Sequence, residues 1–345
     1  MYGATIGKTS YLEFETTTNQ ACCVFCEGDI IDNKFLQFWF KANQEQIITL
    51  AIGGGQPNIS QSIIKHIRLF CPSLDEQKLI VKNLDKKTSE LDTLITKKEK
   101  LIELLKEERT AIINQAVTKG LDPDVEMKDS GVDGGDHRWL GEIPAHWKRM
   151  KLRYVADKIT DGEHISPTFL DEGVPFLSAK DVRDRSINYD VDKFVSFEDA
   201  EKFRRRCDPE RNDVLIVSRG ATIGRVGLVE DDKVFCLLGS VILIKVKSNI
   251  HSLYLYYLLS STKIQEQLNL ASQSSAQQAI YLVSVSELNI PVPTIREQIL
   301  IEKYLKQFDE KYFLALEAIN QEITLLKEYK TALISEVVTG KVKVI

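Results

Sequence analysis

The sequence predicts an α+β protein in which compact domains of mixed strands and short helices are joined by two long helices. Three observations support this prediction: the chain repeats itself, two long runs carry apolar side chains at helical spacing, and short β-branched segments precede those runs. The 345 residues suffice for about two or three domains. A hydrophobic content of 43% and a charged content of 28% are typical of globular chains.

An internal repeat is the most informative feature of the chain. The sequence GATIG occurs at residues 3–7 and again at 220–224, an offset of 217 (220 minus 3). The dipeptide Glu-Gln at 76 recurs at 297, and Val-Thr at 117 recurs at 338, both at an offset of 221. This period is too long for a solenoid. It indicates a duplicated module, each copy made of a compact domain followed by a long helix.

Two amphipathic runs, 76–119 and 296–342, predict the long helices. Their apolar residues recur by threes, fours and sevens, and Gly120 and Gly340 stop the runs. A helix of about 40 residues is about 60 Å long, and so narrow an apolar stripe is expected to be buried in a coiled coil. Two independent surface helices on separate cores are the alternative. The residues expected at helix pairing or partner docking are Leu84, Leu91, Leu105, Ile112, Leu305, Tyr312, Ile319, Leu326 and Leu333.

The segments before each run predict the compact domains. Residues 213–217, 241–246 and 287–293 are short, rich in β-branched side chains and bounded by Gly, Asp or Pro, which is typical of strands. Residues 253–270 have the spacing of a short helix. In the first copy, residues 35–50 and 67–72 take the corresponding parts.

An acidic, glycine-rich stretch at 120–137 separates the two copies. Its sequence, GLDPDVEMKDSGVDGGDH, carries as much net charge as the whole chain, −5, and its composition predicts a flexible linker. The rest of the chain is balanced, which does not exclude a nucleic-acid partner, because a local basic face is sufficient. The predicted divisions are 1–75, 76–119, 120–137, 138–295 and 296–342.

Several motifs in this order resemble the DNA-specificity (S) subunit of a type I restriction–modification system. They are GATIG, NQACC at 19–23, GQPNI at 55–59, GLDPDVEMKDSG at 120–131, LGEIPAHW at 140–147, DGEHISP at 161–167 and VPFLSAKDV at 174–182, with the Glu-Gln dipeptides that begin the helices. Each motif is weak alone, and their duplicated order is specific. The resemblance covers almost the whole chain.

The resemblance implies two target-recognition domains, each reading half of a bipartite sequence of double-stranded DNA, joined by two long antiparallel coiled-coil helices. It implies a cytoplasmic, non-catalytic subunit that docks methylation (M) subunits and recruits the restriction (R) subunit. S-adenosylmethionine, ATP and Mg are then expected on the partner subunits, with no cofactor bound directly.

Relative to that family the chain begins in mid-domain, because only Met1 and Tyr2 precede the first GATIG. Residues 1–75 are therefore expected to be the C-terminal half of a first target-recognition domain, and 138–295 a complete second one. The remnant can still dock partners, or two chains can associate as a homodimer that reads a symmetric site.

The basic segment 202–225 is the main candidate for DNA contact, because Arg can bind guanine edges or phosphates in bidentate fashion. A solvated helix end is the alternative for Arg204–Arg206, and a solvated loop for the glutamines. His164 lies in a turn-rich motif and is otherwise a packed or exposed histidine. The DNA-binding candidates are Arg204, Arg205, Arg206, Arg211, Ser218, Arg219, Arg225, Gln273, Gln277, Gln278 and His164.

Two other clusters favour structural roles. The glycines of GATIG can cradle a phosphate, but they fit a tight turn between strands better, since the motif lacks the Lys-Ser/Thr of a nucleotide loop. Cys22, Cys23 and Cys26 have no fourth ligand nearby, and their alternation with Val24 and Phe25 favours a buried strand over a metal site.

No set of residues can be assigned to catalysis. The chain has no glycine-rich S-adenosylmethionine loop, no Asn/Asp-Pro-Pro-aromatic motif and no GxxxxGK[ST] loop. It also lacks an apolar run long enough to span a membrane and a secretory signal. A coiled-coil interaction protein without a DNA role, and a fragment of a nuclease or methyltransferase, are the alternatives to a specificity subunit.

Overall fold

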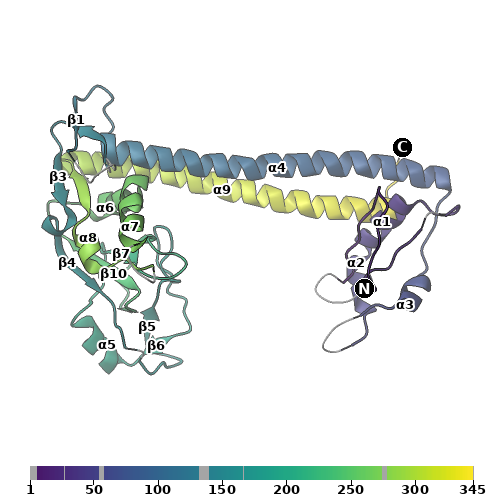
Figure 1. Cartoon of the computed structure of the whole chain (residues 1–345), viewed down its shortest axis with the longest axis horizontal. Coiled ribbons are helices and arrows are strands. Elements are labelled where there is room, and N and C mark those ends of the chain that lie inside the picture. Colours follow the sequence, from purple (N-terminus) through teal and green to yellow (C-terminus); the bar gives the residue numbers. More distant parts are fainter. Residues whose placement is uncertain are drawn as a thin grey trace. The chain divides into compact units, whose positions relative to one another are not determined.

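The computed structural model describes residues 6–26, 28–53, 58–131, 140–165, 167–273 and 278–344. The chain forms two compact units (Figure 1). Unit 1 consists of Met1–Leu104 and Leu314–Ile345, and unit 2 of Leu105–Phe313. The long helices α4 (Leu74–Lys119) and α9 (Ile295–Val338) each contribute to both units. The predicted α+β class with two long helices is confirmed.

The described part of unit 1 has three short helices, and the first of them packs against the parts of α4 and α9 in this unit. These are α1 (Asn33–Ala42), α2 (Gln44–Thr49) and α3 (Gln61–Lys65). Asp32 starts α1 because its side chain accepts hydrogen bonds from the first free N–H groups, those of Lys34 and Phe35. Phe35 and Phe38 then pack in one cluster with apolar residues of both long helices, Val81, Leu84, Ile334, Val337 and Val338.

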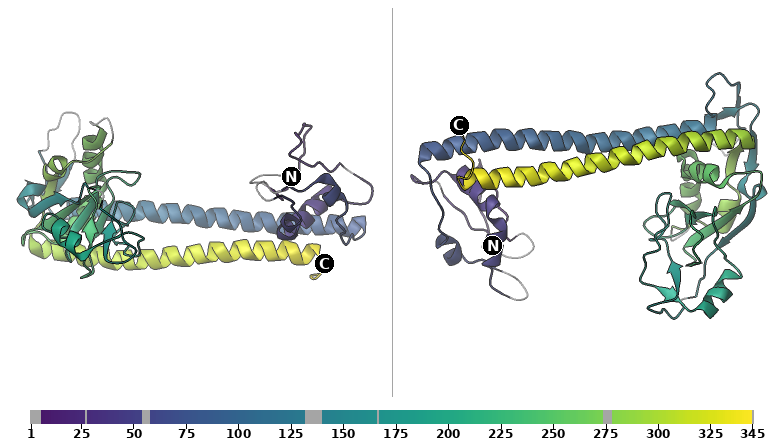
Figure 2. Two further views of the ribbon diagram at one scale, coloured as in Figure 1. Left: turned by 90° about the horizontal axis from the view of Figure 1, so that it is seen from below. Right: turned by 180° about the vertical axis from the view of Figure 1, so that it is seen from behind.

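Within unit 1 the two long helices run antiparallel and lie side by side (Figure 2). Asp92 of α4 pairs with Lys330 of α9 at 2.6 Å, and Lys98, further along α4, pairs with Glu322, which comes earlier in α9. Ile95, Ile319 and Ile323 are buried along the helices. The same antiparallel arrangement holds in unit 2, where Arg109 of α4 meets Asp309 of α9.

Unit 2 contains the remaining elements, which are mostly short strands. They are β1 (Met127–Asp129), β2 (Glu142–Pro144), β3 (Lys148–Lys151), the 3-10 helix η1 (Leu152–Tyr154), β4 (Ala156–Asp161), β5 (Val174–Leu177), β6 (Phe194–Val195), α5 (Phe197–Arg204), β7 (Val214–Val217), β8 (Val226–Leu228), β9 (Cys236–Leu237), β10 (Val241–Val246), α6 (Ser252–Ser260), α7 (Thr262–Gln273), α8 (Leu282–Ser286) and β11 (Asn289–Val292).

A four-stranded antiparallel sheet of order β4-β10-β7-β8 is the centre of unit 2. Both faces of β7 are buried, which explains its uninterrupted apolar sequence. Val214 and Ile216 belong to a core cluster that includes α6, whereas Leu215 and Val217 pack in a second cluster with Phe235. Smaller sheets are formed by β6-β5-β9, by β1-β2 and by β11-β3.

Both long helices begin with the same capping arrangement. The backbone N–H and the hydroxyl of Ser73 donate to Glu76 Oε2 at 3.0 and 2.8 Å before α4. Thr294 donates in the same way to Glu297 Oε2, at 3.0 and 2.7 Å, before α9. This is a capping box, in which the third helical residue and the N-cap satisfy each other's backbone donors.

A fully buried glutamine follows the capping box in each helix. Gln77 Nε2 donates to the carbonyls of Ile30 and Pro72 at 3.1 and 2.8 Å, and Gln77 Oε1 accepts from Asp32 N at 2.8 Å. Gln298 makes the three equivalent bonds to the residues before α6 and α9. Gln77 and Gln298 are both 0% exposed. The duplicated Glu-Gln dipeptide therefore fixes the domain to the helix in both units.

The structure differs from several details of the sequence prediction. Met127–Asp129, inside the predicted linker, forms β1 and pairs with β2, whereas residues 132–137 lie outside the described part of the chain. The single helix predicted at 253–270 is two helices, α6 and α7, separated at Ser261. The helical bounds also shift slightly, because the capping residues place each start just before the Glu-Gln dipeptide.

Two strand predictions in unit 1 are wrong. Residues 19–26 contain no strand, and Cys22 and Cys26 are exposed, because no neighbouring segment in the described part of the chain covers them. Residues 67–72 also form no strand, for lack of a partner there. Where the structure describes the chain, no helix is both long and apolar enough to cross a membrane.

Candidate nucleic-acid interface

One end of the four-stranded sheet gathers several of the candidate residues. In register, Asp161 of β4 faces Ile242, and Val217 of β7 faces Val241, so the carboxyl ends of β4 and β7 meet the start of β10. The chain continues from these ends into loops. We call Asp161 and the loop residues 162–165, 218–225, 238–240 and 278–280 the sheet end.

Backbone hydrogen bonds hold these loops to one another. Glu163 N donates to Leu237 O, and Gly239 N donates to Glu163 O, both at 2.7 Å. Ser218 N donates to Ser240 O at 2.8 Å, and Ile280 N donates to Ser218 O at 2.9 Å. The loops are therefore held in place before any ligand arrives, which lowers the entropic cost of binding.

Two glycines allow this close approach of the loops. A Cβ atom at Gly162 would lie 2.1 Å from the carbonyl oxygen of Leu237, and one at Gly239 would lie 2.5 Å from Nδ1 of His164. A side chain at either position would push the loops apart. Gly162 of the DGEHISP motif thus has a packing role.

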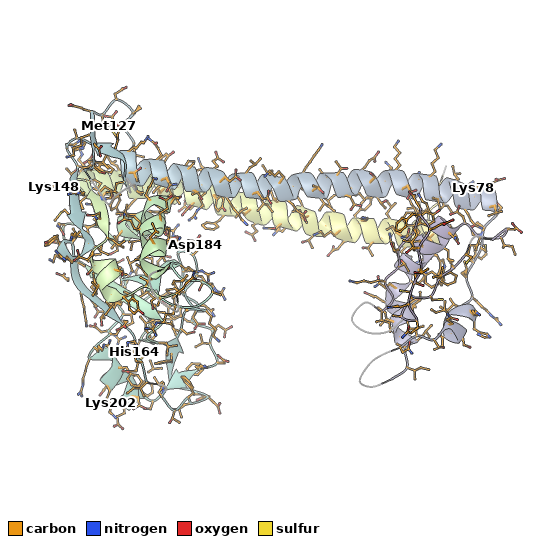
Figure 3. All side chains as sticks on the ribbon, in the orientation of Figure 1. Lys78, Met127, Lys148, His164, Asp184 and Lys202 are labelled. Atoms are coloured by element: carbon orange, nitrogen blue, oxygen red, sulfur yellow. The ribbon has the colours of Figure 1, made fainter. Side chains whose placement is uncertain are left out.

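Asp161 organises the charged side chains here. Its Oδ2 lies 2.8 Å from His164 Nε2, and its Oδ1 accepts a hydrogen bond from Arg206 Nη2. Asp161 is 14% exposed at its side chain, whereas His164 and Arg206 are 44% and 50% exposed. The carboxylate therefore holds two cationic or hydrogen-bonding groups at the surface. His164 lies at the end of unit 2 that is far from α4 and α9 (Figure 3).

Arg219 is the sheet-end cation whose side chain has no partner in the described part of the chain. Its backbone bridges to Ala279, and its exposed side chain makes no hydrogen bond or ion pair within the described residues. The turn that follows contains Gly220 and Gly224, with φ of 99° and 82°. Gln265 of α7 braces this turn by donating to Gly224 O at 2.9 Å.

The remaining arginine candidates are dispersed. Arg204 donates to the carbonyls of Pro209 and Phe235, at 3.3 and 3.0 Å, and so has a packing role. Arg225 donates to Val182 O at 3.2 Å. Arg211 comes before β7, at the opposite end of the strand from Arg219, and pairs with Asp232 at 3.1 Å. Arg205 is exposed next to Arg206.

Other candidates are only partly described. Gln277 lies outside the described residues, and Gln273 is the last residue of α7, of whose side chain nothing is described. Gln278 is exposed beside Ala279, and Ser218 is buried, with its hydroxyl 3.5 Å from Gly239 O. The GATIG glycines described here take the left-handed conformation of a tight turn, and Gly3 is outside the described part.

The residues predicted for helix pairing are all buried or half-buried. Leu84, Leu305, Tyr312 and Ile319 are buried, and Leu91, Leu105, Ile112, Leu326 and Leu333 are half-buried. Whether they also contact a partner protein stays a prediction.

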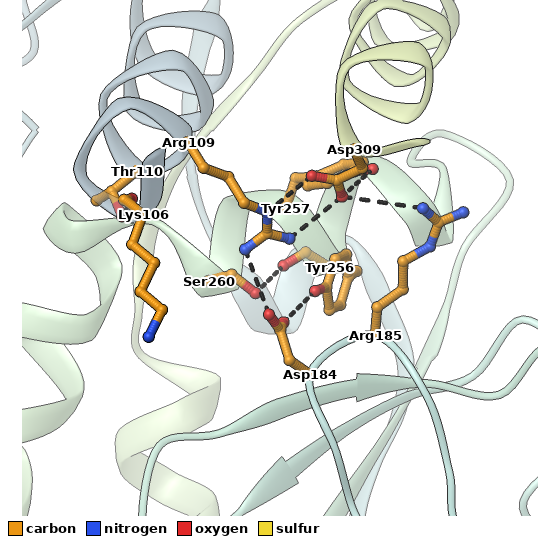
Figure 4. A network of polar contacts seen from close by, with 9 residues as sticks. All are labelled: Lys106, Arg109, Thr110, Asp184, Arg185, Tyr256, Tyr257, Ser260 and Asp309. Atoms are coloured by element: carbon orange, nitrogen blue, oxygen red, sulfur yellow. Dashed lines mark hydrogen bonds and ion pairs between the residues drawn. The ribbon is translucent and has the colours of Figure 1, made fainter. Parts of the chain in front are cut away.

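A buried polar network where the domain meets the helices was not foreseen (Figure 4). Asp309 of α9, 1% exposed at its side chain, accepts hydrogen bonds from Arg109 Nε at 2.7 Å and Nη2 at 3.2 Å, and from the Tyr257 hydroxyl at 3.0 Å. Asp184 accepts from Arg109 Nη1 at 3.3 Å and from the Tyr256 hydroxyl at 2.5 Å. Arg185 Nη1 also lies 3.8 Å from Asp309 Oδ2, so the loop that carries Asp184 and Arg185 is tied to both α4 and α9.

The charges of this network stabilise one another. Burial opposes the charged form of Arg109, but the hydrogen bond to Asp309 and the charges of Asp184 and Asp309 outweigh burial and raise its pKa. Burial and the charge of Asp184 raise the pKa of Tyr256, so its hydroxyl stays a donor. The sequence does carry a signal: Arg109 falls seven residues after Ile102 and seven before Ala116, in the apolar stripe of α4.

Comparison with known proteins decides the family. A model of the type I restriction modification DNA specificity domain matches residues 1–104 and 144–325. The chain belongs to this family. Among its relatives, the MjaVIII specificity subunit of Methanocaldococcus jannaschii is 26% identical over 323 residues, which are 92% of this chain and 72% of that protein. The Escherichia coli EcoBI specificity subunit is 25% identical over 72% of this chain and 55% of its own length.

Solved structures of this family share the fold. A chain from a structure titled for complex assembly and conformational transition of the type I R-M system aligns with a TM-score of 0.71 at 17% identity, over 90% of this chain and 71% of that one. The HsdS subunit of Thermoanaerobacter tengcongensis aligns with a TM-score of 0.51 at 17% identity, over 91% of this chain and 71% of that one. The family resemblance inferred from the sequence motifs is confirmed.

Proposed function

We propose that the chain is the DNA-recognition and scaffold subunit of a type I restriction–modification complex, and that unit 2 reads DNA through its sheet end. The family match supports the DNA-specificity role. The observation that carries the assignment to the sheet end is Arg219, an exposed arginine without a side-chain partner in the described chain, on a loop that two neighbouring loops hold in place.

The chemistry of the sheet end suits a DNA groove. Arg219 is available for a bidentate contact with guanine O6 and N7, and Gln278 beside it for adenine. Arg206 and His164 present donors whose orientation Asp161 fixes. Contacts to phosphates set the register of such a protein on the duplex, and contacts to base edges supply the sequence information.

The long helices are proposed as the scaffold. Each spans parts of both units, and the described residues carry exposed apolar side chains on them, such as Leu101, Leu314 and Leu325. We propose that they dock methylation subunits, which hold S-adenosylmethionine, and that the assembly recruits a restriction subunit, which directs cleavage. In this proposal the chain itself performs no catalysis.

The assignment to the sheet end is tested by the methylation motif that the assembled complex leaves on host DNA. Arg219→Ala is expected to lower the methylation of target sites, or to relax the base preference at one position of the motif. The reason is that a bidentate contact discriminates between bases by about 1–3 kcal/mol, or about 5- to 150-fold. Long-read sequencing of methylated genomic DNA gives the motif. Arg211→Ala is the matched control, since that arginine is exposed and pairs with Asp232. If both variants methylate the same motif, the sheet end does not read the DNA sequence.

The broader assignment is tested by a DNA footprint of the chain with its methylation partners at two salt concentrations. Specific affinity is expected to fall steeply with salt, because phosphate contacts release counterions. A coiled-coil interaction protein without a DNA role gives no footprint at either concentration. Turnover of DNA by the isolated chain would instead favour a nuclease or methyltransferase fragment.

A further inference from the structure

A short hairpin in unit 2, residues 182–187, lies between the edge of the four-stranded sheet and the long helices. An antiparallel bridge between Val182 and Ile187 closes the hairpin, together with two backbone hydrogen bonds of 2.9 and 3.3 Å inside it. This closure leaves Asp184 and Arg185 at the tip.

The tip of the hairpin contacts α6 and both long helices (Figure 4). Asp184 accepts hydrogen bonds from the Tyr256 hydroxyl of α6 at 2.5 Å and from Arg109 Nη1 of α4 at 3.3 Å. Arg185 Nη1 lies 3.8 Å from Asp309 Oδ2 of α9. Each of the two tip residues therefore reaches a different long helix.

The body of the hairpin follows β8, the edge strand of the sheet. Arg225, directly before β8, donates to Val182 O at 3.2 Å, and Glu230, shortly after β8, lies 3.7 Å from Arg185 Nη2. Between these two contacts, a Cβ atom at Gly227 would lie 2.8 Å from Val182 Cγ1, so the glycine lets the hairpin lie close to the strand. Because β8 starts directly after a sheet-end loop, the hairpin connects the sheet end to α4 and α9.

The backbone of Arg185 is unusual for an arginine. Its φ is 63°, in the left-handed region that Gly and Asn favour. A residue held in such a conformation has an energetic cost and persists only where its surroundings hold it there. The guanidinium of Arg185 is 17% exposed and lies between Asp309 and Glu230, and these contacts offset the cost. A glycine would fit this turn without strain, but it would not reach α9.

The contacts of the tip place the hairpin more than they stabilise the fold. The side chain of Asp184 is 56% exposed, and the ion pairs of Arg185 are 3.7 and 3.8 Å long. Exposed or long ion pairs add little to stability. Without Arg185, Asp309 still accepts hydrogen bonds from Arg109 and from the Tyr257 hydroxyl.

We propose that Asp184 and Arg185 are positioning residues, through which hairpin 182–187 holds the loop of Arg219 in a fixed place against α4 and α9. The inference rests on the proposed function, in which this loop reads bases and the long helices dock methylation subunits. The hairpin then sets the distance between the bases that are read and the base that is methylated. A misplacement of about 1 Å can lower the rate of such a reaction about 100-fold.

Two variants loosen the tip and keep the fold. Asp184→Asn retains an acceptor for the Tyr256 hydroxyl and removes the charge that Arg109 contacts. Arg185→Gly retains the left-handed turn and removes the guanidinium. Asn212→Gly is the matched control, because Asn212 is exposed in unit 2 and also has a positive φ, of 71°.

The first measurement separates DNA affinity from the rate of methylation. Complexes of each variant with methylation subunits receive a fluorescein-labelled duplex that carries the motif found by long-read sequencing. Fluorescence anisotropy gives Kd, and single-turnover methylation with radiolabelled S-adenosylmethionine gives the rate. In Asp184→Asn and Arg185→Gly we expect Kd to stay within about twofold and the rate to fall about tenfold or more, with Asn212→Gly unchanged in both. A merely structural role would lower the thermal unfolding midpoint and weaken affinity and rate together.

The second measurement is hydrogen–deuterium exchange of the full chain alone, without DNA. Amides of residues 222–226 are expected to exchange faster in the two tip variants than in Asn212→Gly, while amides of β4 stay unchanged. Unchanged exchange at 222–226, a full methylation rate in both tip variants, or an equal loss of affinity and rate would overturn the proposal. If the unsubstituted complex binds no DNA, or Arg219→Ala leaves the motif unchanged, the proposed function fails, and the exchange measurement still decides whether the hairpin fixes the loop.

Discussion

The two units join their domains to the long helices in the same way at one point and differently at another. At the start of each helix, the capping box and the buried glutamine are alike down to the atoms that bond. Further along the helices the two copies diverge. At the offset of 221 residues, Arg109 of unit 2 corresponds to Lys330 of unit 1, and Asp309 of unit 2 corresponds to Thr88 of unit 1.

The divergence follows from what covers the helices. In unit 2 the loop that bears Asp184 reaches Arg109, and Tyr257 completes the hydrogen bonds of Asp309, so a charged pair can be buried. In unit 1, Lys330 instead pairs with Asp92, whose side chain is 59% exposed, and Thr88 bonds to a carbonyl of its own helix. A charge enters the helix interface only where the domain supplies enough partners to satisfy it.

The largest effect is therefore expected from Arg109→Met. This change leaves Asp309 buried without its main partner, at a cost of about 3 kcal/mol in the free energy of unfolding. Lys330→Met, at the duplicate position, is expected to cost less than about 1 kcal/mol, because it removes an exposed pair. Guanidinium denaturation of both variants measures the difference, and hydrogen–deuterium exchange assigns it to unit 2. Equal losses would mean that the two junctions do not differ in the way described.

An intermediate and equal effect is expected at the point where the two units agree. Gln77→Ala and Gln298→Ala each remove a buried amide that bonds to three backbone groups, so each leaves buried donors and acceptors unsatisfied. A loss of about 2 kcal/mol is expected for each variant. The same denaturation measurement applies, with exposed Gln46, changed to Ala, as the control. A large loss in one unit alone would break the equivalence of the two helix starts.

The sequence predicted what repetition and periodicity can encode. The offset of 221 aligned the helix starts to the residue, and the apolar stripes predicted the paired helices, since both depend on local spacing. The GATIG glycines predicted a turn because few other residues take its backbone conformation.

What the sequence did not predict depends on contacts between distant segments. Arg109 and Asp184 are 75 positions apart, and nothing local to either shows that they meet. The arginine-rich run looked like one basic surface, yet Arg204 faces carbonyl groups and Arg211 lies at the other end of β7. Residues 67–72 have the composition of a strand and form none, because a strand also needs a partner.

The smallest effect is expected in acid, and it contrasts the two capping glutamates. Burial alone would raise the pKa of Glu297, but hydrogen bonds from Thr294, Trp147 and His146 lower it to about 2, from 4.5. The pKa of Glu76 is lowered chiefly by the Ser73 hydroxyl, without a Trp or His donor. Because the pKa of folded Glu297 lies below its unfolded value, its contribution is fully present above pH 4.5 and is lost as the pH falls toward 2.

Glu297→Gln is therefore expected to flatten the fall in stability between pH 4.5 and 2 more than Glu76→Gln does. Thermal unfolding of the three proteins across that range, at constant ionic strength, measures the slopes. Identical slopes for both variants would show that Trp147 and His146 contribute nothing to the charged form of Glu297, and the contrast between the two capping sites would then be geometric only.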